Sequence, residues 1–119
     1  MSEPTYTLWV KTGDEALGGT DSNVFVMLIG ESGRTEWVYL PPEDIFAFEQ
    51  GSTDKFILDV PDLGNLTQCC VGHDASADSG WYVEYVRVKH NTSGTEWKFV
   101  FNEWLGKEES GRTAVCVTC

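Results

Sequence analysis

The sequence has few basic residues and no long apolar run. Eight Lys and Arg residues oppose nineteen Asp and Glu residues, which gives the 119-residue chain a net charge of −11. Such an acidic surface repels nucleic-acid phosphates, and it also repels anionic lipid unless a positive group intervenes. We therefore expect no nucleic-acid partner. The surplus of carboxylates leaves two alternatives open: an ordinary solvated acidic surface, or carboxylates clustered around a hard cation that would cancel charge locally.

No stretch is long and apolar enough to cross a membrane, and the first five residues lack the basic and apolar regions of a secretory signal. We therefore expect a cytoplasmic or peripheral membrane location, where reduced thiols are the default. The four cysteines are Cys69, Cys70, Cys116 and Cys119. Adjacent cysteines in one strand point to opposite faces, which disfavours a zinc ion shared by Cys69 and Cys70.

A helical period of apolar residues is also missing. Short alternating or apolar runs are instead separated by Gly, Pro, Asn and Asp, which predicts strands. Eight such runs lie at 6–11, 24–29, 35–40, 56–60, 66–71, 82–88, 97–101 and 113–117. Leu66, Cys69 and Val71 are the expected inward positions of the fifth run, and their spacing predicts a bulge. The pattern favours a single all-β domain over residues 1–119, an antiparallel sandwich.

Histidine is scarce, and this scarcity weighs against catalysis. His73 and His90 are the two histidines of the chain. A triad of His73, Asp74 and Ser76 is disfavoured because sequence neighbours on a turn rarely meet in triad geometry. We expect no enzyme activity. The alternative, a cysteine-based redox protein, predicts a strongly lowered thiol pKa at Cys70 or Cys116.

Two polar loops between predicted strands, 12–23 and 73–80, are rich in Gly, Asp and Asn. Calcium takes six to eight oxygen ligands from carboxylates, amides and backbone carbonyls, and glycine lets the backbone turn several carbonyls to one point. The candidate donors are the side chains of Asp21, Asn23, Asp74 and Asp78 and the carbonyls of Gly18 and Gly19. The alternative is that these residues form ordinary Asx turns.

Several sequence blocks resemble the PLAT domain, also called the lipoxygenase homology domain. They include Gly-Gly-Thr-Asp-Ser-Asn-Val-Phe-Val at 18–26, Phe-Glu-Gln-Gly-Ser-Thr-Asp-Lys-Phe at 48–56 and Gly-Trp-Tyr-Val at 80–83. Further blocks at 62–66, 72–74 and 101–105 follow in the family's order. The resemblance spans nearly the whole chain, and it implies a sandwich of two four-stranded antiparallel sheets.

The resemblance also implies a domain that binds membranes or protein partners, often with calcium at loops on one end. Its calcium ligands fall on Gly19, Thr20 and Asp21, and on Asp74 and Asp78 before the Gly-Trp block. An acidic loop that binds another calcium in some members corresponds to Glu43 and Asp44, as secondary candidates.

Membrane contact has weaker support in the sequence. Leu17 lies on the tip of the first loop and would contribute only about 2–3 kcal/mol if it inserted. Trp104 lies near a loop, where an amphipathic ring can sit at a membrane interface, although packing within the fold is the alternative. We expect a monomeric, calcium-binding module that docks on lipid or protein. A calcium-independent interaction module from a multidomain protein is the alternative.

Overall fold

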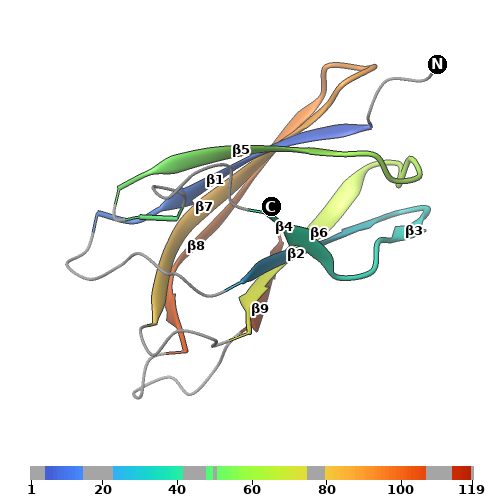
Figure 1. The fold of residues 1–119 in the computed structure, drawn as a ribbon. Coiled ribbons are helices and arrows are strands. Elements are labelled where there is room, and N and C mark those ends of the chain that lie inside the picture. Colours follow the sequence, from blue (N-terminus) through green and yellow to red (C-terminus); the bar gives the residue numbers. More distant parts are fainter. Residues whose placement is uncertain are drawn as a thin grey trace.

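The computed structural model describes residues 5–14, 23–41, 48–49, 51–74, 80–106 and 114–118. These residues form nine strands, which pair antiparallel in two facing sheets (Figure 1). The predicted all-β sandwich of two antiparallel sheets is therefore confirmed. Within the described ranges, no helix is long and apolar enough to span a membrane.

The four-stranded sheet has the order β5-β1-β7-β8. Its strands are β1 (Tyr6–Thr12), β5 (Thr53–Leu58), β7 (Trp81–His90) and β8 (Glu96–Leu105). The five-stranded sheet has the order β3-β2-β6-β9, and β4 also pairs with β2. Its strands are β2 (Val24–Gly30), β3 (Gly33–Arg34), β4 (Val38–Leu40), β6 (Leu66–His73) and β9 (Ala114–Thr118).

The second sheet has one strand more than expected, because the predicted strand 35–40 is shortened to β4 at 38–40 and an unpredicted strand, β3 at 33–34, precedes it. Thr35 is buried, its Oγ1 accepts a hydrogen bond from the Leu28 backbone N–H at 3.1 Å, and the hydroxyl donates to the Glu36 carbonyl at 2.7 Å. A threonine side chain that bonds backbone groups competes with the strand ladder. The chain therefore pairs with β2 in two short pieces, β3 and β4.

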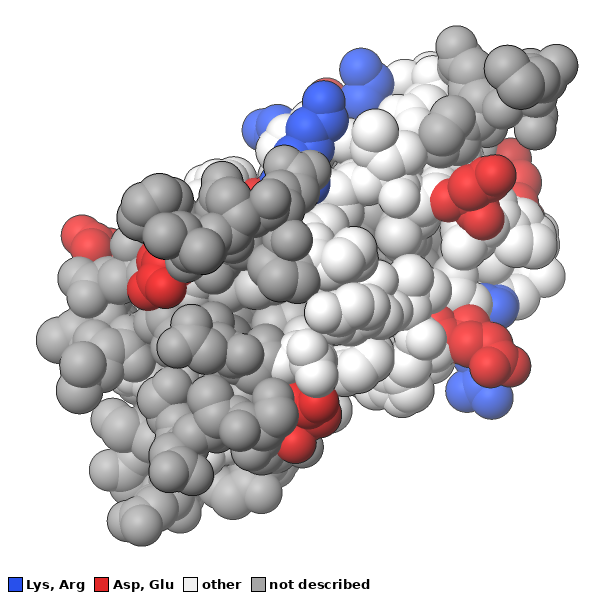
Figure 2. Space-filling view, in the orientation of Figure 1, with Lys and Arg blue, Asp and Glu red and all other residues white. Residues whose placement is uncertain are grey.

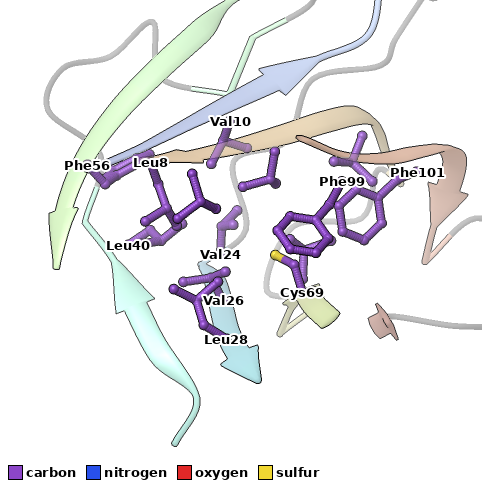
Figure 3. Close-up of a cluster of buried hydrophobic side chains, with 14 of the residues drawn as sticks. Leu8, Val10, Val24, Val26, Leu28, Leu40, Phe56, Cys69, Phe99 and Phe101 are labelled. Atoms are coloured by element: carbon purple, nitrogen blue, oxygen red, sulfur yellow. The ribbon is translucent and has the colours of Figure 1, made fainter. Parts of the chain in front are cut away.

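The core lies between the sheets and follows from the alternation of apolar residues along the strands. Leu8 and Val10 of β1 and Val24, Val26 and Leu28 of β2 are fully buried. Figure 3 shows these side chains converging from the two sheets, with Phe56, Phe99, Phe101 and Cys69 beside them. Burying a large aliphatic side chain contributes about 1.5–3 kcal/mol, so this layer is the main source of stability.

The predicted bulge in β6 is present. Gly30 of β2 lies opposite Leu66, whereas the preceding Ile29 lies opposite Gln68, so Thr67 is the extra residue. The insertion changes which residues face inward. Leu66, Cys69 and Val71 are all buried in the core, as the sequence indicated.

Candidate functional site

The two polar loops begin and end at the same end of the sandwich. The first leaves β1 at Thr12 and enters β2 at Val24, so it passes from the four-stranded to the five-stranded sheet. The second leaves β6 at His73 and enters β7 at Trp81, so it passes back in the opposite direction. Because Val24 pairs with His73, the residues just beyond this ladder are forced together.

Asn23 and Asp74 are these residues, and three hydrogen bonds join them. The Asn23 backbone N–H donates to Asp74 Oδ1 at 3.1 Å, and its side-chain Nδ2 donates to Oδ2 at 2.7 Å. The Asp74 N–H donates in return to the Asn23 carbonyl at 3.1 Å. Both residues are exposed. The structure thus brings together one predicted ligand from each loop.

Tyr39 on β4 extends this contact to a third segment. Its hydroxyl donates to Asn23 Oδ1 at 3.3 Å, and its ring packs on Phe25 with a centroid separation of 5.6 Å. Tyr39 and the nearby Trp37 are 44% and 46% exposed, so aromatic surface adjoins the Asn23–Asp74 pair. Sequence reasoning missed Tyr39, because only the pairing of Tyr39 with Phe25 places it beside the loop.

The other ends of the loops are fixed on the four-stranded sheet. Trp81 Nε1 donates to Thr12 Oγ1 at 3.0 Å, and both residues are fully buried. The Gly13 N–H donates to the Tyr82 carbonyl at 2.9 Å. A Cβ on Gly13 would lie 2.3 Å from the Tyr82 ring, so this close approach requires glycine.

Trp104, the candidate membrane contact, packs against the ring of Tyr82. The two rings lie 5.4 Å apart with an interplanar angle of 76°, an edge-to-face arrangement, and Trp104 is half-buried. The ring therefore belongs to the loop end of the sandwich, where it supports Tyr82. Its contact with a membrane stays a prediction.

His73 has a structural contact at the same end. Its ring is buried, and its Nε2–H donates a hydrogen bond to the Leu105 carbonyl oxygen at 3.0 Å. This bond ties the end of β6 to the end of β8 across the two sheets. The contact fixes the base of the second loop.

Most of the predicted ligands lie outside the part of the chain that the structure describes. The predicted site residues outside the described ranges are Leu17, Gly18, Gly19, Thr20, Asp21, Glu43, Asp44 and Asp78. Among the residues that are described, no three His, Cys, Asp or Glu side chains form a metal-binding group. Asn23 and Asp74 supply amide and carboxylate oxygens, the donor types that calcium prefers, so this part of the site fits the ion.

The cysteines differ from the expectation of reduced thiols. Cys70 on β6 lies directly opposite Cys116 on β9, and the two form a disulfide with a sequence separation of 46. The expectation was wrong for this pair because it took no account of strand pairing, which aligns two residues distant in sequence. Cys69 points to the opposite face, and its burial raises the pKa of the free thiol well above the ordinary value.

The chain folds as a small β-sandwich module, in which two polar loops connect the sheets at the same end. The sequence profile of the PLAT/LH2 domain matches residues 6–117. The chain belongs to this family.

Curated relatives agree with this assignment. The chain is 40% identical over 104 residues to lipoxygenase homology domain-containing protein 1 of Homo sapiens, a match that covers 87% of the chain and 5% of that protein. It is 32% identical over 117 residues to human polycystin-1-like protein 1, covering 96% of the chain and 4% of that protein. The chain therefore spans about a twentieth of the length of these relatives.

Solved structures share the fold. A coral 8R-lipoxygenase, whose description includes calcium activation through a C2-like domain, superposes with a TM-score of 0.82 at 23% identity, covering 95% of the chain and 16% of the enzyme. A lipoxygenase described as a calcium-dependent 11R-lipoxygenase superposes with a TM-score of 0.70 at 23% identity, covering 98% of the chain and 17% of that protein.

Proposed function

We propose that this chain is a calcium-binding PLAT module that docks on a lipid surface or a partner protein when calcium is bound. The observation that carries the proposal is the contact between Asn23 and Asp74, which joins one candidate ligand from each loop. Two lipoxygenases that contain this fold are described as calcium-activated or calcium-dependent, and this supports the proposal. Asp21 and Asp78 would complete the ligand set.

Calcium would act on electrostatics and on loop geometry. A divalent cation held by Asp74 would replace the hydrogen bonds that its carboxylate now accepts from Asn23, and it would link the two loops more firmly. It would also cancel negative charge at one end of a chain whose net charge is −11. Phosphate-bearing lipid or an acidic protein surface then approaches at lower electrostatic cost.

We propose binding rather than catalysis as the role of the domain. The chain has two histidines, and both have structural partners. His73 bonds the Leu105 carbonyl, and His90 bonds Asp62 at 2.9 Å and the Ser93 N–H at 3.1 Å. These hydrogen bonds give both imidazoles a structural role, and no catalytic role is needed to account for them.

Calcium titration by calorimetry tests the proposal. We expect heat of binding with the wild-type chain, and an affinity at least roughly 10- to 100-fold weaker in Asp21→Ala and in Asp74→Ala. Asp59→Ala is the matched control, because Asp59 is an exposed carboxylate that follows β5 at the opposite end of the sandwich. Absence of heat with wild type, or full affinity in both site variants, contradicts the proposal.

A calcium-independent interaction module is the second candidate. The chain spans only about a twentieth of the length of its relatives. This favours the second candidate, because one domain of a long protein can serve to contact neighbouring domains. This candidate predicts partner binding that survives a chelator. The calcium-binding module predicts binding that the chelator weakens and added calcium restores.

A further inference from the structure

Most of the basic residues that the structure describes belong to one sheet of this acidic protein. Six of its eight Lys and Arg residues lie in the described ranges, and five of these six belong to strands of the four-stranded sheet. They are Lys11, Lys55, Arg87, Lys89 and Lys98. Figure 2 shows basic side chains along the upper edge of the molecule, above β5 and β1 in the same view of Figure 1.

Strand register aligns these residues in rows across the outer face. Trp9 of β1 lies opposite Lys55 on one side and Arg87 on the other, and Arg87 lies opposite Lys98. A continuous row Lys55–Trp9–Arg87–Lys98 therefore crosses all four strands. The residues next to it along β1 and β7, namely Leu8, Val10, Val86 and Val88, are fully buried. The row consequently points away from the core.

One further row lies on each side of this central row. The first contains Ile57, Thr7, Lys89 and Glu96, and the second contains Thr53, Lys11, Tyr85 and Val100. We call the three rows the cationic face. It carries five positive charges and one negative charge, on a chain whose net charge is −11.

Aromatic rings hold two of the cations in place. The Arg87 Cζ lies 4.4 Å from the centroid of the Trp9 ring, and the Lys98 Nζ lies 4.5 Å from that of Tyr85. Cation–π contacts of this kind orient the charge without neutralising it. The ion pair between Arg87 Nε and Glu96 Oε1 is long, at 3.6 Å, and both side chains are about half exposed. The ion pair is therefore weak, and the positive charge of Arg87 stays largely available to a ligand.

We propose that the cationic face is a calcium-independent contact for an anionic lipid bilayer. The face is a sheet four strands wide, and four of its five cations are lysines, which protein–protein interfaces disfavour and anionic leaflets attract. Ile57 and Val100 are 58% and 49% exposed on the flanking rows, where a bilayer interface would cover them. The Trp and Tyr in the rows are residue types that membrane interfaces favour.

The net negative charge of the chain does not prevent this contact. The molecule measures 40 × 26 × 21 Å, whereas charges are screened over about 8 Å at physiological salt. The bilayer therefore experiences mainly the charge of the nearest face. The proposal is independent of the calcium site, which it supplements with a second contact on a different surface.

Vesicle co-sedimentation in excess EDTA tests the proposal. The probes are phosphatidylcholine vesicles with and without about 30% phosphatidylserine. We expect the wild-type chain to bind only the phosphatidylserine vesicles. Because each lysine near an anionic leaflet contributes about fivefold in affinity, Lys55→Gln/Lys98→Gln is expected to bind about 30-fold more weakly.

Arg34→Glu is the matched control, because it changes the net charge by the same two units. Arg34 is exposed in β3, on the other sheet, so the control is expected to bind within about threefold of wild type. Circular dichroism confirms that each variant is folded. Adding calcium to the same samples measures the loop site separately, so either proposal can fail alone.

Three results would overturn the proposal. One is the absence of wild-type binding to phosphatidylserine vesicles in EDTA. Another is an equal loss in Arg34→Glu and in the double variant, which would assign the effect to net charge. The third is binding to a soluble poly-glutamate peptide without binding to vesicles, which would assign the cationic face to an acidic protein partner.

Discussion

At the scale of single residues, Asn23 and Asp74 carry the described part of the candidate site. The sequence identified both as oxygen donors, because they lie in loops rich in Gly and Asp. It gave no means of knowing that they bond each other, since 51 positions separate them. Their contact depends on the Val24–His73 pairing, and pairings between distant strands leave little trace in local patterns.

Asp62 and His90 form a second residue-scale contact that contributes to the pH dependence of stability. The Gly64 N–H donates to Asp62 Oδ1 at 2.9 Å, and His90 Nε2 donates to Oδ2 at 2.9 Å, because His90 Nδ1 is occupied as the acceptor of the Ser93 N–H. These two hydrogen bonds, the Gly64 bond first, lower the pKa of Asp62 below its ordinary value of 3.8.

The sign of the effect follows from the lowered pKa. The stabilisation is fully present above the ordinary pKa of 3.8 and is lost as the pH falls through the lower pKa of the folded state. The difference in unfolding free energy between wild type and Asp62→Asn should therefore shrink as the pH falls below that value. Urea unfolding at a series of pH values measures it, with Asp59→Asn as the control. A difference that is constant with pH contradicts the assignment.

At the scale of elements, apolar alternation predicts most of the strands and the inward residues of β6. The same alternation predicts strand boundaries poorly where they depend on specific hydrogen bonds or on strand pairing. The predicted strand 35–40 begins only at Val38, because the Thr35 hydroxyl bonds backbone groups. The β5 strand begins at Thr53, three residues before the predicted start, because its first residues pair with Lys11 and its neighbours on β1.

The Cys70–Cys116 disulfide links β9 to β6, and β9 is the last strand in the order of its sheet. A bond between two residues 46 positions apart in the sequence restricts the unfolded chain and contributes about 2–4 kcal/mol to stability. A reducing agent should therefore lower the unfolding free energy of the wild-type chain by about this amount. Cys70→Ala/Cys116→Ala should already have the lower stability and should not respond to the agent.

Non-reducing peptide mapping provides the direct control for this prediction. A linked peptide pair that contains Cys70 and Cys116 is the expected result. Alkylation of both thiols in the unreduced protein would contradict the pairing.

At the scale of the whole molecule, the two proposed contacts lie on different surfaces of one sandwich. The loop end presents the candidate calcium ligands Asn23 and Asp74, which flank β2 and β6 of the five-stranded sheet. The cationic face presents most of the described basic residues in register across the four-stranded sheet. The sequence reveals the excess of acidic residues but not the segregation of the basic ones. Segregation depends on four strands that lie at widely separated positions in the chain.

A crystal structure from crystals grown in the presence of calcium tests the central claim, that residues of both loops bind one calcium ion. We predict an ion with oxygen ligands at about 2.3–2.6 Å that include the carboxylate of Asp74 and at least one residue of the first loop, with Asp21 as the leading candidate. The account is contradicted if the loops are well ordered in saturating calcium, no ion is bound, and the Asp74 carboxylate still accepts both hydrogen bonds from Asn23.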